Sequence, residues 1–194
     1  MVSPSKLSHV VFQSNDPYQL ADWYATLLDA RINFKSAFIT TITYDEEHHR
    51  MAFMGMPPGT VEVSSRREPN KVGFAHFAFG YESPERLLGA YERAKERNIE
   101  PVICLHHGPT ISLYYKDPDA NNVELLVDCM TSQEACAYLE SPAFEKNFVG
   151  QPFDPAAALA RLKAGASNEE IMFFDPDVNV DVLALGMEAT AKMA

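Results

Sequence analysis

The chain has 194 residues, of which 46% are hydrophobic and 22% charged, and this length allows one domain with a sizeable core and an appendage. Its formal net charge of −11 would repel phosphate backbones, so we expect no nucleic-acid partner. No apolar run is long enough to span a bilayer, so we expect no membrane partner either.

The first half of the chain predicts a strand, a helix and three further strands. Residues 7–13 are rich in β-branched residues and indicate a strand. Asp16 and Pro17 then have the form of a helix N-cap and first helical position, and apolar residues recur at helical spacing over residues 20–28. Three further strands are expected at residues 30–35, 38–44 and 48–54.

The second half repeats this order. Residues 73–79 predict a strand, Ser83 and Pro84 repeat the cap signal, and residues 87–94 carry an apolar helical stripe. His9 precedes Pro17 by eight residues, and His76 precedes Pro84 by the same number. Such self-similarity indicates an internal repeat. The strands that complete the second βαβββ unit are expected at residues 102–105, 111–115 and 123–128.

The remaining residues predict a linker and a helical tail. Residues 55–70 carry proline and charged residues and indicate a linker, with a short strand favoured at 60–64. After Asp128 the pattern becomes helical, and the tail is too short to have a core of its own. Tail helices are expected at residues 133–139, 154–162, 167–170 and 181–191, the third with a capping-box sequence.

These elements together predict an α+β fold. We expect two paired βαβββ modules that form a curved mixed sheet around a metal site, with a helical C-terminal extension. The expected domain boundaries are 1–130 for the paired modules and 131–194 for the extension packed on them. The N-terminal sequence has no signal-peptide core, and the three cysteines show no C-x-x-C spacing. Both features indicate reduced thiols in a cytoplasmic protein.

Four polar residues are candidates for a metal site. His9 and His76 are expected in the first strands of the two units, and His49 and Glu124 at equivalent places in the last strands. If the units pair about a pseudo-twofold axis, these side chains converge on one concave face in the right register. Glu124 lies in an apolar strand, where a carboxylate needs a partner or a metal. Two histidines and a carboxylate form the facial triad of non-haem Fe(II) sites.

At these residues the chain resembles the vicinal oxygen chelate superfamily, and more narrowly its extradiol ring-cleaving dioxygenases. Leu7-Ser-His9 and Phe74-Ala-His76-Phe resemble the strands that give the two iron histidines. Glu47-His48-His49-Arg50 resembles the paired-histidine strand of that family. The family signature is matched by His107, Leu113-Tyr114, Asp117-Pro118 and Glu124.

The resemblance implies a role for each residue. His9, His76 and Glu124 would bind Fe(II), with Mn, Zn or Ni as alternative metals. His49 would be the general acid/base, while His107 and Tyr114 would hydrogen-bond the substrate oxygens. The implied partners are a small aromatic diol and O2, in the breakdown of aromatic compounds, and a homodimer or higher homo-oligomer is expected.

Neighbouring residues are expected to be structural. Tyr115 would point to the opposite face from Tyr114 in a regular strand, and His48 would alternate away from His49.

Two rival functions remain open at this point. A glyoxalase-like isomerase would use His9, His49, His76 and Glu124 as four ligands of one divalent metal, without oxygen. A non-catalytic small-molecule-binding resistance protein has the same fold but needs no metal triad. The paired histidines and the combination of His107 with Tyr114 favour the dioxygenase. Metal content and oxygen uptake would separate these three functions.

Overall fold

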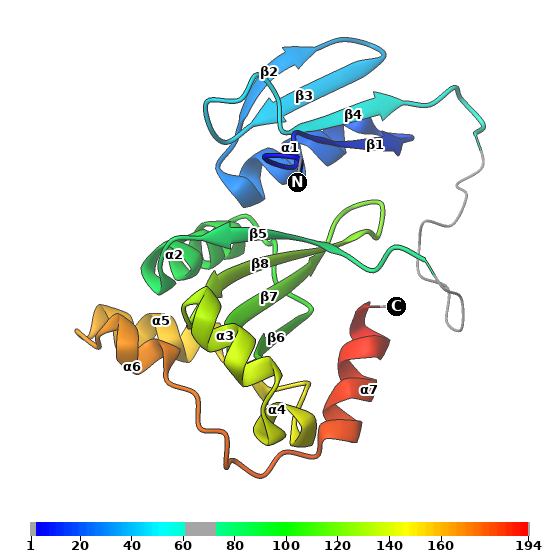
Figure 1. Cartoon of the computed structure of the whole chain (residues 1–194). Coiled ribbons are helices and arrows are strands. Elements are labelled where there is room, and N and C mark those ends of the chain that lie inside the picture. The colour runs from blue at the N-terminus through cyan, green and yellow to red at the C-terminus, as the bar shows by residue number, and fades with distance from the viewer. Residues whose placement is uncertain (1–2, 61–72, 194) are drawn as a thin grey trace. The chain divides into compact units, whose positions relative to one another are not determined.

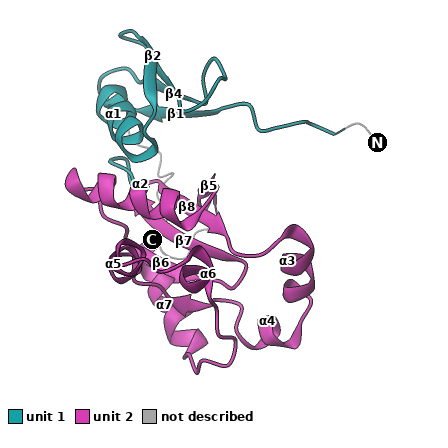
Figure 2. Cartoon of the chain, turned by 90° about the vertical axis from the view of Figure 1, so that its left-hand side faces the viewer, with its two compact units in different colours: residues 1–64, 117–120 teal, residues 65–116, 121–194 magenta. Residues whose placement is uncertain are grey.

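A computed structural model describes residues 3–60 and 73–193 of the chain. The chain divides into two compact units (Figure 2): unit 1 contains residues 1–64 and 117–120, and unit 2 contains residues 65–116 and 121–194. The strand favoured at 60–64 lies outside the described residues, apart from Thr60. Among the described residues, no helix has both the length and the hydropathy of a membrane span.

Unit 1 is a βαβββ module with one four-stranded sheet. The order of its strands is β1-β4-β3-β2, with β1 parallel to β4 and the other neighbours antiparallel. The helix begins where the sequence predicts, because the Asp16 side chain accepts a hydrogen bond from the Gln19 backbone N–H at 2.9 Å. The elements are β1 (Val10–Ser14), α1 (Pro17–Leu28), β2 (Arg31–Lys35), β3 (Ile39–Thr43) and β4 (Met51–Gly55).

Helix α1 covers one face of this sheet (Figure 1). Tyr24 on the helix packs against Phe12 and Phe53 on the strands, with ring centroids 5.5 Å apart in both cases. Side chains alternate along a strand, so Val11 and Met54 lie on the other face, where both are exposed. Helix α1 therefore packs on one face of this sheet, and the other face carries exposed apolar side chains.

The turn at residues 117–120 belongs to unit 1 through its contacts. The Tyr24 hydroxyl donates a hydrogen bond to Asp117 Oδ2 at 2.9 Å. Burial raises the pKa of Tyr24, and the Asp117 carboxylate raises it further. The Asp-Pro turn is thus fixed by a buried tyrosine that keeps its proton.

Unit 2 contains the second βαβββ module, as predicted. The strand order is β5-β8-β7-β6-β9, and β5 is parallel to β8 just as β1 is to β4. Ser83 caps the helix by accepting the Arg86 N–H at 3.4 Å. The module consists of β5 (Phe77–Tyr81), α2 (Pro84–Glu96), β6 (Ile103–His106), β7 (Thr110–Lys116) and β8 (Asn122–Asp128).

The C-terminal extension follows within unit 2. The expected helices are present, and the capping box at Ser167 and Glu170 is formed. Helix α4 and strand β9, which pairs with β6, were not expected. The elements are α3 (Ser132–Leu139), α4 (Pro142–Lys146), β9 (Gln151–Pro152), α5 (Pro155–Lys163), α6 (Asn168–Met172) and α7 (Val182–Met193).

Helix α7, red in Figure 1, packs on strands β6 and β7. Its Leu185 and Ala189 share a buried cluster with Ile103, Leu105 and Tyr114. Tyr115 points the other way, as expected, because its neighbours include Tyr91 on α2. The extension therefore packs on the strand face that carries Tyr114. The division into a domain of residues 1–130 and an extension of 131–194 stays a prediction.

The strand registers correct one expectation about the repeat. His9 and His76 do occupy equivalent places, each one residue before the first strand of its unit. In the parallel pairs, however, Glu124 aligns with Ala78 and its counterpart Ala52 aligns with Val11. The expected equivalence of His49 and Glu124 is therefore wrong. The reason is that residues 45–50 form a loop and strand β4 begins only at residue 51.

Candidate functional site

In unit 2, a histidine and a glutamate meet beside the first strand. His76 precedes β5, and Glu124 lies on β8 opposite Ala78. The imidazole Nε2 of His76 is 3.1 Å from Glu124 Oε2. These are donor atoms of the kinds that bind a borderline divalent metal, and they converge within one unit. The pair therefore fits part of a metal site.

Glu124 is kept ionised although only 6% of its surface is exposed. Burial acts to raise the pKa of its carboxyl group, but hydrogen bonds with His76, Ser112 and Tyr114 outweigh burial and lower the pKa. Tyr114 is its direct neighbour across the β7–β8 pair, and Ser112 lies two residues away on the same face. A buried anion held by donors is a suitable metal ligand.

His107 lies next to Tyr114 and has a defined tautomer. Its Nδ1 is 2.7 Å from the carbonyl oxygen of Val149, and because a carbonyl only accepts, Nδ1 carries the hydrogen. The other nitrogen, Nε2, is 3.0 Å from the Tyr114 hydroxyl. Burial lowers the pKa of His107 and outweighs the opposing effects of Val149 and Glu124. A neutral His107 therefore accepts a hydrogen bond from the Tyr114 hydroxyl.

Tyr114 stands between the two groups and keeps its proton. Burial raises the pKa of its hydroxyl well above the ordinary value, and the adjacent Glu124 carboxylate raises it further. The phenol is thus a hydrogen-bond donor at neutral pH, with His107 Nε2 and the Glu124 carboxylate as alternative acceptors for its single proton. Its ring also packs edge-on against His76, with centroids 5.4 Å apart. Four predicted site residues therefore form one connected group in unit 2: His76, His107, Tyr114 and Glu124.

In unit 1, three histidine rings lie together. The rings of His9 and His49 stack with centroids 4.7 Å apart. His48 does not alternate away from His49, as expected from a strand, since their rings are 4.4 Å apart and their Nδ1 atoms 2.5 Å apart. That expectation was wrong because both residues lie in the loop before β4. With Nδ1 directed at His48, the Nε2 of His49 is left for other chemistry.

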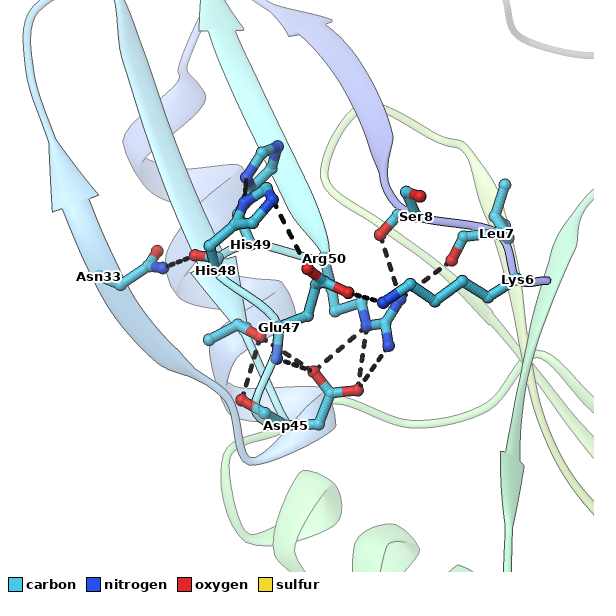
Figure 3. A network of polar contacts seen from close by, with 10 residues as sticks. Lys6, Leu7, Ser8, Asn33, Asp45, Glu47, His48, His49 and Arg50 are labelled. Carbon is cyan, nitrogen blue, oxygen red and sulfur yellow. Dashed lines mark hydrogen bonds and ion pairs between the residues drawn. The ribbon is translucent and has the colours of Figure 1, made fainter. Parts of the chain in front are cut away.

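Arg50 holds this loop against the segment before His9 (Figure 3). Its guanidinium donates to the carbonyl oxygens of Leu7 at 2.9 Å and Ser8 at 3.2 Å, and it pairs with Asp45 at 2.9 Å. The hydrogen bond with Arg50 lowers the pKa of the Asp45 carboxyl group. Arg50 thus links the loop that carries His49 to the two residues before His9.

Glu47 supports the same loop from another side (Figure 3). Its carboxylate pairs with Lys6 and lies 3.5 Å from His48 Nε2. Partial burial lowers the pKa of His49, as do the neighbouring imidazoles of His48 and His9, although Glu47 opposes them. His49 is therefore neutral at pH 7, the form a general base requires.

The predicted metal ligands are divided between the units. His9 belongs to unit 1, whereas His76 and Glu124 belong to unit 2. Within either unit, the described part of the chain brings no three His, Cys, Asp or Glu side chains into a group that could hold a metal ion. The three-residue ligand set therefore stays a prediction.

Two further contributors were missed by sequence reasoning. Ser112 hydrogen-bonds Glu124, and its position two residues before Tyr114 was a usable signal, because both side chains share a strand face. Val149 acts through its backbone carbonyl. No residue type marks such a contact, so it cannot be found from the sequence.

Comparison with known proteins gives a family match. A family model described as the glyoxalase/bleomycin resistance protein/dioxygenase superfamily matches residues 6–125. Two curated proteins from Rhodococcus globerulus are similar to the chain. Biphenyl-2,3-diol 1,2-dioxygenase 2 is 40% identical over 172 residues, which is 88% of each chain. Biphenyl-2,3-diol 1,2-dioxygenase 3 is 35% identical over 172 residues, covering 88% of this chain and 89% of the relative.

Solved structures share the fold at low identity. A glyoxylase/bleomycin resistance protein/dioxygenase domain from Frankia sp. EAN1pec has a TM-score of 0.53 and 18% identity, covering 65% of this chain and 93% of that one. The fosfomycin resistance protein FosX from Mesorhizobium loti has a TM-score of 0.50 and 18% identity, covering 69% and 99%. At such identity the likeness shows the fold alone.

Proposed function

Because this chain belongs to the glyoxalase/bleomycin resistance protein/dioxygenase superfamily, we propose that it is an extradiol dioxygenase that opens the ring of a catechol-type substrate with O2. The observation that carries this proposal is the connected group of His76, Glu124, Tyr114 and His107. It combines two candidate metal ligands with a phenol that can donate to a bound diol. The identity to the Rhodococcus diol dioxygenases supports the same reaction.

The name of those relatives also supports the cleavage position. In a 2,3-diol that is opened at the 1,2 bond, the broken bond lies beside the two hydroxylated carbons and not between them. This is extradiol cleavage, in which both oxygen atoms of O2 enter the product. We therefore propose a 2,3-dihydroxybiphenyl-like substrate, with other 3-substituted catechols as close alternatives.

The family relationship implies a metal cofactor, and we propose Fe(II) held by His9, His76 and Glu124. Imidazole and carboxylate ligands suit this ion, and three of them leave positions open. When bound, Fe(II) supplies the one-electron and O2 chemistry that no side chain provides. The hydrogen-bonded and ionised state of Glu124 supports its place in the set.

The protein contributes proton transfer and orientation. We assign His49 as the general base that takes a proton from the diol, because it is neutral and its Nε2 is not used by His48. When a diol is bound, the Tyr114 hydroxyl turns its single proton from His107 Nε2 toward a substrate oxygen and stabilises the negative charge that develops there. His107 supports Tyr114 through the contact at Nε2.

The strand registers argue against a four-ligand isomerase. That function would take two ligands from equivalent places in each unit, but the residue of unit 1 that corresponds to Glu124 is Ala52. Alanine cannot bind a metal. His49 lies in the preceding loop with its Nδ1 against His48, which suits an acid/base role better than ligation.

We also propose a homo-oligomer in a reducing, cytoplasmic setting. Strand β2 is an edge strand that is exposed along its whole length, and Phe34 and Phe38 of unit 1 expose 54% and 79% of their surfaces. Exposed apolar side chains at an edge favour self-association. All three cysteines are free, as is usual where thiols stay reduced. Gel filtration coupled to light scattering would report the mass of the oligomer in solution.

The test is anaerobic reconstitution with Fe(II), followed by a panel of catechols that includes biphenyl-2,3-diol, with air then admitted. We expect oxygen uptake and a new visible absorption from the ring-opened product. Matched samples loaded with Zn(II) or Ni(II) should consume no oxygen. Two results would refute the proposal. One is an Fe(II)-loaded protein that takes up no oxygen with any diol, and the other is a Zn(II)-loaded protein that isomerises a thiol adduct.

A further inference from the structure

The turn between α4 and β9 lies directly against the backbone of His107. Gly150, with φ +93°, has so little space that an added Cβ would be 2.2 Å from the His106 carbonyl oxygen and 2.7 Å from His107 Cα. Such distances are not compatible with any side chain, so only glycine fits here. Strand β9 begins at the next residue and pairs with β6, with His106 opposite Gln151. The extension is therefore in backbone contact with the residue that precedes His107.

A buried asparagine holds this turn in its shape. Asn147 Oδ1 accepts the Gly150 N–H at 2.8 Å, and its Nδ2 donates to the Gly150 carbonyl oxygen at 3.0 Å. Both hydrogen bonds are internal to the turn, and Asn147 is 7% exposed. The turn is thus closed by its own side chain and presents the Val149 carbonyl in one direction.

That direction is toward the imidazole of His107. The Val149 carbonyl oxygen lies 2.7 Å from Nδ1, so the hydrogen of a neutral ring is fixed on Nδ1 and the lone pair on Nε2. The lone pair faces the Tyr114 hydroxyl at 3.0 Å. If the hydrogen were on Nε2 instead, the ring would donate to Tyr114, and the hydroxyl would have to turn toward Glu124.

We propose that the turn Asn147–Gly150 of the C-terminal extension is a positioning element of the catalytic site, which fixes the tautomer of His107 and thereby directs the Tyr114 hydroxyl. Asn147 and Gly150 are positioning residues, since they act through the Val149 carbonyl and touch no reacting atom. The inference about the His107 tautomer rests only on contacts within unit 2, whereas its consequence for turnover rests on the proposed function.

A second contact of the extension supports the same role. Helix α7 places Leu185 and Ala189 against Tyr114 in one buried cluster, and Val149 packs on that cluster. Asn122 on β8 donates to the carbonyl oxygens of Met193 at 2.7 Å and Ala75 at 3.3 Å. The extension therefore contacts His107 and Tyr114 directly, and Asn122 links it to the backbone of the residue before His76.

The direct test is nuclear magnetic resonance of the full chain labelled with 15N-histidine, before metal is added. The His107 ring is identified by the signal that disappears in His107→Gln. We expect the hydrogen on Nδ1 in the wild-type chain. In Gly150→Ala and Asn147→Ala we expect a mixture of tautomers, because the carbonyl is displaced.

Kinetics on the Fe(II)-loaded chain provide the second readout. In both variants kcat should fall about 100-fold, as for a small misplacement of a catalytic group, with KM little changed. Asn147→Asp should recover part of the loss, since its carboxylate can still accept the Gly150 N–H. Gly165→Ala is the matched control: it has the same kind of backbone, φ +98°, but nothing within 4 Å of the added Cβ, so both readouts should be wild-type.

The outcomes separate the two claims. The inference is overturned if His107 of the wild-type chain carries its hydrogen on Nε2, or if the His107 tautomer is unchanged in both variants. A changed tautomer with an unchanged kcat overturns the positioning role. A wild-type protein that opens no diol contradicts the proposed function, and the resonance data then still decide whether the turn sets the tautomer.

Discussion

The Tyr114 hydroxyl has one proton and two acceptors. His107 Nε2 lies 3.0 Å from it and the Glu124 carboxylate also interacts with it, so the state of either neighbour decides where the proton points. Burial raises the pKa of the phenol, which keeps it a donor throughout the neutral range. A donor aimed at developing charge is among the larger single contributions to catalysis.

Replacing Tyr114 by phenylalanine tests this role. Tyr114→Phe should lower kcat about 100-fold, because one charge-stabilising donor is lost, while KM stays similar. The free energy of unfolding should fall by only about 1 kcal/mol, the usual net contribution of one hydrogen bond. Oxygen-uptake kinetics and urea unfolding measure both. An unchanged kcat would remove Tyr114 from the mechanism.

The division of roles among the histidines and the glutamate has its own test. His9→Ala, His76→Ala and Glu124→Ala should each greatly weaken iron binding, because each removes one of three ligands. His49→Ala should keep the metal and lose turnover. Iron is measured after gel filtration of the reconstituted variants. Equal loss of metal in all four would show that the assigned roles are wrong.

At the scale of elements, local signals decided what could be predicted. The caps at Asp16 and Ser83 and the apolar stripes that follow them placed α1 and α2 correctly, since these signals depend only on near neighbours. Helix α4 and strand β9 are too short, at five and two residues, to show a period. The sequence predicts a strand from residue 48, whereas residues 48–50 lie in the loop before β4, and this error misplaces His49 relative to Glu124.

His106 ties β6 to the last residue of α6, and this contact predicts a pH dependence. Its Nε2 lies 3.0 Å from the Met172 carbonyl oxygen, and its Nδ1 accepts the Gly108 N–H at 3.2 Å, so the bonded ring is neutral. Burial lowers the pKa of His106 in the folded chain. The unfolded chain therefore takes up the proton first as pH falls below about 6.5.

The free energy of unfolding should accordingly decrease as pH falls through about 6.5 and level off below the folded pKa of His106. One proton contributes at most about 1.4 kcal/mol per pH unit. His106→Gln should be less stable at about pH 7.5 but show a shallower slope down to about pH 5.5. Urea unfolding across this range measures both. A slope as steep as that of the wild-type chain would assign the effect to other groups.

At the scale of the whole molecule, the extension completes unit 2. Its α7 covers Ile103, Leu105 and Tyr114, and β9 extends the sheet at β6. The sequence indicated that the tail must pack on the rest of the chain, but not on which face. That choice depends on side chains that are distant in sequence. The meeting of His9 with His76 and Glu124 also depends on residues that are distant in sequence, and it stays a prediction.

Removal of the extension tests this dependence. A chain truncated after Asp128 should fail to fold stably, because it exposes the apolar face of β6 and β7 and loses the partner of His107. Circular dichroism, urea unfolding and gel filtration report the outcome. A truncated chain that folds and keeps full activity would exclude any role of the extension in the site.

Turnover in 18O2 tests the central claim most directly. The Fe(II)-loaded chain is given biphenyl-2,3-diol under labelled oxygen, and the mass of the product is measured by mass spectrometry. We predict a ring-opened product that carries two labelled oxygen atoms from a single O2 molecule, allowing for exchange with water. A product with no label, or a substrate returned unopened, would contradict the assignment of this chain as an extradiol dioxygenase.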